Sequence, residues 1–164
     1  MGVATCCGCP IAFSPAASST QSGKTVKLSA FRKQSLGPLT LNAGKNVVLF
    51  FYPADATPGC TKEACAFRDA YSDFVSAGAV VLGVSSDSAE SHASFADAND
   101  LPFPLLVDEG DEVRNAYGVP ADLFGLIKGR QTFVIDTDGN VVLSFNNQFA
   151  PDDHVKKTLA VLGA

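Results

Sequence analysis

Two cysteines, Cys60 and Cys65, lie five residues apart in the stretch YPADATPGCTKEACAFRD, residues 52–69. Cys60 directly follows a Thr-Pro-Gly sequence, which is typical of a helix start because threonine is a favoured N-cap and proline a favoured first residue. With Thr57 as the N-cap, Cys60 takes the third helical position and faces backbone N–H groups that lack intrahelical partners. These groups and the positive end of the helix dipole favour the thiolate over the thiol. Cys60 is therefore a candidate nucleophile.

The spacing of the two cysteines indicates an order of events. Residues five apart on a helix are separated by about 7.5 Å along the axis and roughly 140° around it. Their Cα atoms are then about 8–9 Å apart, beyond the roughly 7 Å that a disulfide spans. The sulfurs of Cys60 and Cys65 can bond only if the helix unwinds locally. This suits a nucleophile that first reacts with another molecule and then meets the second thiol.

A peroxide is the reaction partner that fits this order. A thiolate that attacks an O–O bond becomes a sulfenic acid, which condenses with a second thiol to a disulfide. The N–H groups of the helix start would stabilise the departing oxyanion. The alternative is that Cys60 and Cys65 are ordinary small helix residues, and for Cys65, two residues before Phe67, this alternative stays open.

The elements that must position Cys60 follow from the hydrophobic pattern. Continuous apolar runs such as NVVLFFYP indicate strands buried on both faces, and apolar residues at helical spacing follow the cysteine motif. The pattern predicts an α/β fold with a central mixed sheet and helices on both faces. Cys60 then lies at the carboxyl end of a strand, where sites of α/β proteins usually form. The expected elements are strands at 46–53, 79–86 and 103–108, helices at 58–77, 89–98 and 111–118, a hairpin at 130–145 and a closing helix at 151–163.

Composition restricts the class of protein. The 164 residues are 46% hydrophobic and 18% charged, which is typical of one globular domain. The net charge of −5 disfavours a nucleic-acid binder, and no apolar run is long enough to span a membrane. No secretory signal is recognisable, so we expect an intracellular, reducing compartment and catalytic rather than structural cysteines.

The N-terminal part differs from the rest in charge. Residues 1–54 contain five basic and no acidic residues, whereas residues 55–164 contain seven basic and all 17 acidic ones. An acid-free, hydroxyl-rich composition is typical of organelle transit peptides, and the alternative is a flexible segment without a targeting role. We therefore expect residues 1–21 to be a flexible N-terminal segment and a candidate for targeting, with the compartment, plastid or cytoplasm, left open. Residues 22–164 form the expected domain.

Three further cysteines, Cys6, Cys7 and Cys9, lie in the N-terminal segment. A zinc site is disfavoured because a second ligand pair at finger-like spacing is missing, and His92 and His154 are isolated in the sequence. Acylation of these cysteines is a second alternative. We expect them to be cysteines of a disordered tail and predict no metal site.

The stretches FFYPADATPGCTKEACAFRD, ADLFGLIKGRQTFVID and NNQF resemble the peroxiredoxin family, in its peroxiredoxin Q or bacterioferritin comigratory protein (BCP) branch. The resemblance covers about residues 46–162 and is strongest in the P-x-x-x-T-x-x-C motif. It implies a thioredoxin-like fold and thiol-dependent reduction of hydrogen peroxide and organic hydroperoxides. It also implies a role in antioxidant defence and redox homeostasis.

The same resemblance implies roles for individual residues. Cys60 corresponds to the peroxidatic cysteine and Cys65 to a resolving cysteine in the same chain. Thr57 would donate its hydroxyl to the thiolate and peroxide, and Pro53 would shield the site from water.

Arg130 corresponds to the arginine that stabilises the thiolate and polarises the peroxide. Glu63 would orient this arginine, although a carboxylate that interacts with the helix dipole is an equally good interpretation of its position. An intrachain disulfide is re-reduced by an external dithiol, for which the resemblance implies thioredoxin, with glutaredoxin or glutathione as alternatives. No metal, flavin or haem is needed, and with both thiols in one chain we expect a monomer.

The N-terminal third departs from the family pattern. Residues 22–31 resemble an early hairpin strand, but residues 32–45 make the connection to the next strand roughly a dozen residues longer than usual in the family. Other functions stay open: a disulfide exchanger or redox sensor with a thioredoxin fold, a chaperone-like binding protein, and a metal-binding N-terminus.

Overall fold

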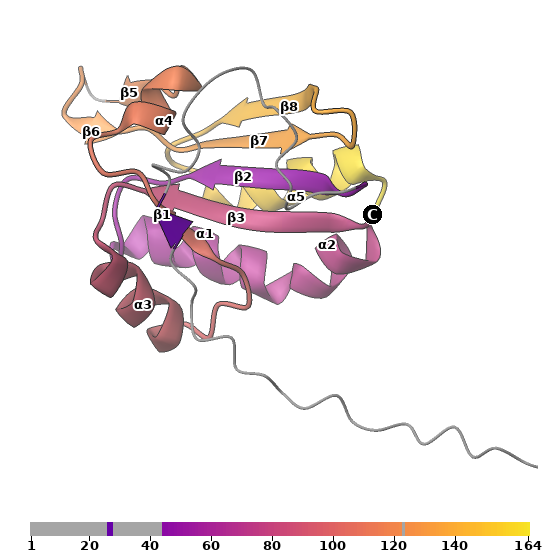
Figure 1. Ribbon diagram of the computed structural model, residues 1–164, viewed down its shortest axis with the longest axis horizontal. Helices are drawn as coiled ribbons and strands as arrows, with labels where there is room; N and C mark the ends of the chain where they lie inside the picture. The colour runs from indigo at the N-terminus through magenta and orange to yellow at the C-terminus, as the bar shows by residue number, and fades with distance from the viewer. Residues whose placement is uncertain (1–25, 28–43, 123) are drawn as a thin grey trace, which may run out of the picture.

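A computed structural model describes residues 26–27, 44–122 and 124–164 of the chain. Its centre is a six-stranded sheet with the strand order β1-β4-β3-β2-β7-β8 (Figure 1). The strands are β1 (Val26–Lys27), β2 (Asn46–Phe51), β3 (Ala79–Ser85), β4 (Leu105–Val107), β7 (Gln131–Ile135) and β8 (Val141–Asn146). The helices are α1 (Pro58–Asp69), α2 (Tyr71–Ser76), α3 (Ala89–Ala98), α4 (Glu112–Ala116) and α5 (Pro151–Leu162).

The sheet is mixed, as the sequence predicts. Strands β1, β4, β3 and β2 run parallel, β7 pairs antiparallel with β2, and β8 pairs antiparallel with β7. β2 is therefore paired on both sides, and its carboxyl end leads into the loop before α1. This arrangement places the cysteine motif at the middle of the sheet.

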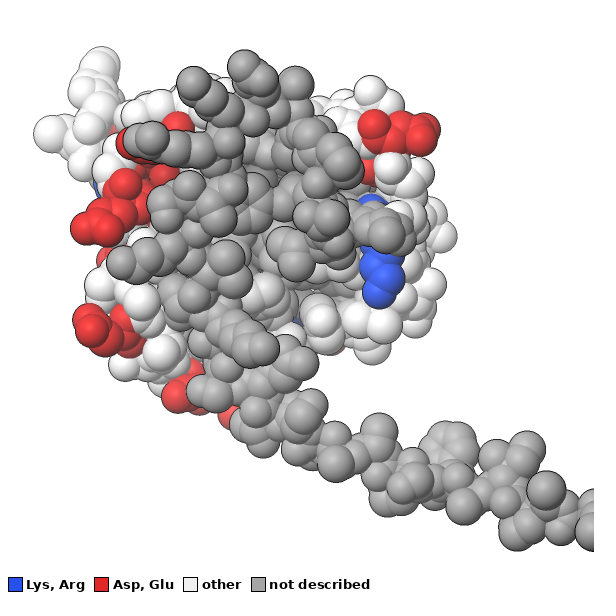
Figure 2. Space-filling view, in the orientation of Figure 1, with Lys and Arg blue, Asp and Glu red and all other residues white. Residues whose placement is uncertain are grey.

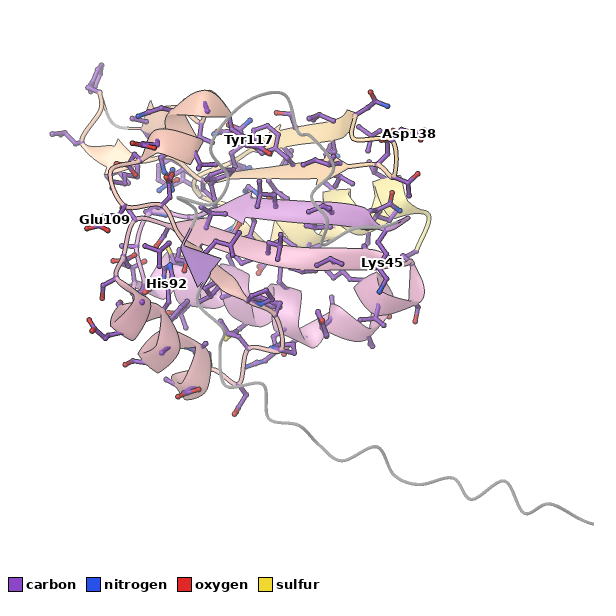
Figure 3. All side chains as sticks on the ribbon, viewed as in Figure 1. Lys45, His92, Glu109, Tyr117 and Asp138 are labelled. Atoms are coloured by element: carbon purple, nitrogen blue, oxygen red, sulfur yellow. The ribbon has the colours of Figure 1, made fainter. Side chains whose placement is uncertain are left out.

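Alternate side chains of β2 pack into two different cores. Val48 and Phe50 belong to a core shared with α1, α2, α3 and α5, and Phe50 stacks on Phe67 of α1 with the ring centroids 4.5 Å apart. Leu49 and Phe51 belong to the core on the opposite face, which is completed by side chains of α4 and by Tyr117 (labelled in Figure 3). Helices thus cover both faces of the sheet, which confirms the predicted fold class.

The helix expected over 58–77 is in fact two helices, and the prediction of one continuous helix is wrong. The break is at Ala70, whose backbone angles are φ −94° and ψ 7°. Ala70 carries no helix-breaking side chain, so packing decides the break. α1 packs along α5, whereas α2 packs on β3. Phe74 of α2 also contacts Phe67 of α1, with the ring centroids 5.6 Å apart.

Other boundaries differ from the prediction in smaller ways. The strand expected at 103–108 is limited to Leu105–Val107, since Pro104 has no N–H to donate to a neighbouring strand. The hairpin around Gly139 forms as expected, with Gly139 at φ 87°. The ribbon of β5 (Ala121–Asp122) and β6 (Ile127–Lys128) was not predicted.

Among residues 1–43 the structure describes only Val26–Lys27, which form the edge strand β1, parallel to β4. The expected segment 1–21, the rest of the strand at 22–31 and all but the end of the insertion at 32–45 lie outside the described residues. On the face shown in Figure 2, the described acidic side chains lie in separate groups near the rim, and few basic side chains are visible. The described residues of this face thus form no continuous basic surface.

Candidate active site

The first turn of α1 presents Cys60 as the sequence predicts. Thr57 is the N-cap with extended backbone angles, Pro58 is the first helical residue, and Cys60 in the third position is 2% exposed. The Thr57 hydroxyl makes no cap to the α1 backbone and instead donates to the Ala54 carbonyl oxygen at 3.1 Å. The N–H groups of the first turn therefore receive no side-chain cap. A thiolate at Cys60 lies beside these donors and the positive end of the helix dipole.

Arg130, which directly precedes β7, joins Cys60 to Glu63. Its Nη2 donates to Cys60 Sγ at 3.5 Å, its Nη1 donates to Glu63 Oε2, and its Nε donates to the Gln148 carbonyl oxygen at 3.4 Å. Arg130 and Glu63 are both buried, at 2% and 0% exposure. The guanidinium is thus held in one orientation with one edge toward the sulfur. A fixed positive charge at this distance stabilises a thiolate and a developing oxyanion.

Glu63 is the buried carboxyl of this group. Burial raises the pKa of Glu63 to about 8, against the lowering effect of the Arg130 charge and hydrogen bond. Its Oε2 accepts from Arg130, whereas Oε1 has no hydrogen-bond partner among the described residues. Oε1 lies 3.6 Å from Nδ1 of His154 on α5.

His154 is fully buried behind the Glu63–Arg130 pair and was not predicted as a site residue. Its Nε2 faces the Asn147 carbonyl oxygen at 2.9 Å, and its Nδ1 faces the Thr132 hydroxyl at 2.8 Å. Burial and, to a smaller extent, the Arg130 charge lower the pKa of His154 to about 4, against the raising effect of the hydrogen bond to Asn147. A signal for this position exists in the sequence, because His154 lies on the apolar stripe of α5 at helical spacing from Pro151, Val155 and Thr158.

The loop between β2 and α1 is anchored by a second buried group. Asp55 accepts hydrogen bonds from the Tyr52 hydroxyl at 2.7 Å and the Ser91 hydroxyl at 2.7 Å, and lies 2.8 Å from His92 Nδ1. Burial alone would raise the pKa of Asp55, but these hydrogen bonds bring it below its ordinary value. Figure 3 shows His92 between α3 and the sheet, where its Nε2 lies 3.2 Å from the Leu106 carbonyl oxygen. This group fixes the loop that carries the half-buried Pro53.

Arg114 of α4 holds the backbone next to two site residues. Its Nη2 donates to the Tyr52 carbonyl oxygen and its Nη1 to the Gly129 carbonyl oxygen, both at 2.6 Å. These carbonyls directly precede Pro53 and Arg130. In the sequence Arg114 is one of several charged residues of a short helix, so only the fold identifies it.

Cys65 lies apart from the other site residues. It is on the same unbroken helix as Cys60, half-buried, with Sγ 3.7 Å from Asn99 Oδ1. Both cysteines are free thiols. Because α1 is continuous from Pro58 to Asp69, a Cys60–Cys65 bond requires this helix to unwind. Cys6, Cys7 and Cys9 lie outside the described residues.

The structure thus brings Cys60, Glu63 and Arg130 together, with Thr57 at the adjacent N-cap and Pro53 on the loop before it. Within the described ranges, no three His, Cys, Asp or Glu side chains are grouped so that they could hold a metal ion. None of the helices in the described part of the chain is long and apolar enough to cross a bilayer.

Comparison with known proteins identifies the family of the chain. The family model described as the AhpC/TSA family matches residues 12–144. The chain belongs to the AhpC/TSA family. It is 54% identical over 142 residues to the chloroplastic peroxiredoxin Q of Sedum lineare, covering 87% of this chain and 70% of that protein. It spans about 60% of the length of further peroxiredoxin Q proteins that match it.

Two solved structures are similar to the chain. The peroxidoxin BcpB of Mycobacterium tuberculosis is 43% identical with a TM-score of 0.69, over 76% of this chain and 82% of that one. The bacterioferritin comigratory protein of Xanthomonas campestris, studied for its alkyl peroxide reduction activity, is 34% identical with a TM-score of 0.66, over the same shares of both chains. The resemblance to the peroxiredoxin Q branch and the thioredoxin-like fold class are thereby confirmed.

Proposed function

We propose that the chain is a thiol peroxidase that reduces hydrogen peroxide and organic hydroperoxides through Cys60. The observation that carries the proposal is the Arg130 guanidinium, which contacts Cys60 Sγ at 3.5 Å and is held in place by the buried Glu63. This is the arrangement that a thiolate nucleophile requires. Membership of the AhpC/TSA family and the alkyl peroxide reduction activity of the Xanthomonas campestris relative support it.

In the first step the Cys60 thiolate attacks the terminal oxygen of the hydroperoxide. The O–O bond breaks, an S–O bond forms, and the departing alkoxide or hydroxide takes up a proton to leave as alcohol or water. Arg130 and the N–H groups of the α1 start stabilise the negative charge as it moves from sulfur to the leaving oxygen. Thr57 turns its hydroxyl from Ala54 toward the bound peroxide, and Pro53 keeps water from the sulfur.

In the second step Cys65 resolves the sulfenic acid. The Cys65 thiolate attacks Cys60 Sγ, the S–S bond forms, and the hydroxide that leaves is protonated to water. Since both residues belong to α1, this step unwinds the helix between them and separates Glu63 from Arg130. An external dithiol, thioredoxin or glutaredoxin, then reduces the disulfide by exchange, and the protein works as a monomer.

The cellular role that follows is antioxidant defence. The chloroplastic relatives and the acid-free residues 1–54 support a plastid location over the cytoplasm. A fluorescent fusion of the full chain, compared with one that lacks residues 1–21, tests the location. The alternative function is a disulfide exchanger or redox sensor with a thioredoxin fold, which would pass oxidation to partner proteins instead of turning over with peroxide.

The test is a single-turnover experiment on the fully reduced full-length chain. One equivalent of hydrogen peroxide is added, the reaction is followed by stopped flow, and disulfides are mapped by mass spectrometry. We expect a Cys60–Cys65 bond in the wild type, a trapped Cys60 sulfenic acid in Cys65→Ser, and no peroxide consumption in Cys60→Ser. A Cys60 thiol that survives for minutes contradicts the peroxidase function. Stable mixed disulfides with partners, without peroxide turnover, would support the redox-sensor alternative.

A further inference from the structure

Behind Cys60 lies a row of buried polar side chains that ends at His154. His154 has no role in the mechanism above. Cys60 Sγ contacts Arg130, Arg130 contacts Glu63 Oε2, and Glu63 Oε1 lies 3.6 Å from His154 Nδ1. None of these four side chains is more than 3% exposed. Charge on any one of them is therefore felt by the others with little screening by water.

The neighbours of His154 decide which of its ring nitrogens carries hydrogen. Nε2 lies 2.9 Å from the Asn147 carbonyl oxygen, which can only accept, so Nε2 must carry the hydrogen of the neutral ring. The one lone pair of Nδ1 then accepts from the Thr132 hydroxyl at 2.8 Å, so Nδ1 has its hydrogen-bond partner. Glu63 Oε1 lies 3.6 Å from Nδ1, beyond hydrogen-bond distance, and is a buried oxygen without a hydrogen-bond partner among the described residues.

When Glu63 is ionised and His154 is neutral, the negative Oε1 therefore lies beside the Nδ1 lone pair in a buried site with no donor of its own. A buried charge without a partner is costly, and a proton on Glu63 Oε1 removes this charge and its repulsion with the lone pair. We infer that Glu63 and His154 share a single proton, so that His154 is a positioning residue which sets the charge opposite Arg130. This inference rests on the proposed function, because it explains how Arg130 is kept available to Cys60.

The shared proton changes the summed charge of these four buried side chains. With the proton present, the Cys60 thiolate and the Arg130 guanidinium balance each other, and the Glu63–His154 pair is neutral. Without it, the Glu63 carboxylate competes with the thiolate for the same guanidinium, and the buried group carries one uncompensated negative charge. The charged group that faces His154 from its own helix is Asp153, which raises the pKa of His154 slightly. Loss of the proton should therefore slow the attack on peroxide.

The raised pKa of Glu63, about 8, places the loss of this proton just above neutral pH. The lowered pKa of His154, about 4, means that the proton resides mainly on the Glu63 carboxyl, beside the neutral ring. The substitution Glu63→Gln imitates this state, because a neutral amide presents its C=O to Arg130 and places no charge beside His154. It cannot lose a proton at any pH near neutral.

The first readout is independent of activity. The chain contains only two histidines, so the ring nitrogens of His154 can be followed by ¹⁵N NMR of the reduced full-length protein from pH 6 to 9. We expect hydrogen to stay on Nε2 throughout and the Nδ1 signal to shift as the proton is lost, with no such shift in Glu63→Gln. Titration of the His154 ring at the ordinary histidine pKa of 6.5, unchanged by Glu63→Gln, overturns the inference.

The second readout is the pH dependence of the single-turnover rate constant with hydrogen peroxide. We expect the wild-type rate constant to fall by about tenfold above the midpoint of the Nδ1 shift, a partial loss of what an oxyanion donor supplies. Glu63→Gln should abolish this fall, and His154→Gln should move its midpoint. Lys157→Gln, an exposed change on α5, is the matched control and should behave as wild type. A fall that persists in Glu63→Gln contradicts the inference but leaves the peroxidase function intact, whereas no peroxide consumption in the wild type contradicts the function alone.

Discussion

Raising the pH from 6.5 to 8 should destabilise the reduced protein through Glu63. Burial raises the pKa of Glu63 from 4.5 to about 8, so the folded protein holds a proton that the unfolded chain has lost. Stability from this proton is fully present below about pH 4.5 and is lost as the pH rises through about 8. His154 acts in the opposite sense, because burial lowers its pKa from 6.5 to about 4. Its contribution is present above about pH 6.5 and is lost as the pH falls toward 4.

The size of the effect follows from the two pH ranges over which Glu63 and His154 bind protons differently in the folded and unfolded states. One proton bound differently by the folded and unfolded states changes the free energy of unfolding by about 1.4 kcal/mol per pH unit. Between about pH 4.5 and 6.5 the effects of Glu63 and His154 on the free energy of unfolding have opposite signs and cancel. The two residues together hold one proton in the folded state and one in the unfolded state. Between about pH 6.5 and 8 only the Glu63 slope remains, which removes about 2 kcal/mol of stability.

Urea unfolding of the reduced protein at closely spaced pH values measures this change. Glu63→Gln is the matched comparison, because every other titrating group is shared and cancels in the difference between the two curves. We expect the wild type to lose about 2 kcal/mol relative to Glu63→Gln between pH 6.5 and 8. Parallel curves over this range would refute the reasoning, because Glu63 would then be ionised in the folded protein at neutral pH.

Three further predictions concern the positions of the site residues. A Cβ on Gly59 would lie 3.2 Å from Arg130 Nη2, so Gly59→Ala should displace the guanidinium and slow single-turnover peroxide reduction by about tenfold, while thermal unfolding shows little loss of stability. Arg130→Met should lower the same rate constant by about 10²–10³, whereas Arg130→Lys, which keeps the charge but not the two-sided contact, should lose less. Asp55→Asn leaves donors of Ser91 and His92 facing an amide N–H₂, and urea unfolding should show a loss of about 1–3 kcal/mol.

The parts of the fold that local patterns determine could be predicted from the sequence. The buried strands, the N-cap at Thr57 and the third helical position of Cys60 follow from apolar runs and from the preferences of threonine and proline. The break of the long helix at Ala70 could not be predicted, because no residue there disfavours a helix. The β5–β6 ribbon has no alternating pattern, and only its four paired residues and the tertiary context define it.

The site was predictable to the extent that its members lie close together in the sequence. Thr57 and Glu63 each lie three residues, less than one helical turn, from Cys60, so helix geometry alone brings them near it. His154 and Arg114 reach the site only because the sheet brings α5 and α4 to its two faces. The sequence marks His154 only as a polar residue on an apolar stripe, which does not identify its partner.

The position of Glu63 between Cys60 and Cys65 links the two halves of the proposed reaction. Attack on peroxide needs α1 intact, because only the folded helix holds Glu63 against Arg130 and the guanidinium against Cys60. Resolution needs the same segment unwound, since the helix keeps the two sulfurs apart. Unwinding removes Glu63 from its buried site, where its ionisation is costly, and returns it toward water, where it ionises freely. The proton held with His154 is therefore released when the disulfide forms at neutral pH, and it must be regained when the external dithiol restores the helix. The Glu63–His154 pair thus couples the release and uptake of a proton to the unwinding of α1 and to the redox state of Cys60.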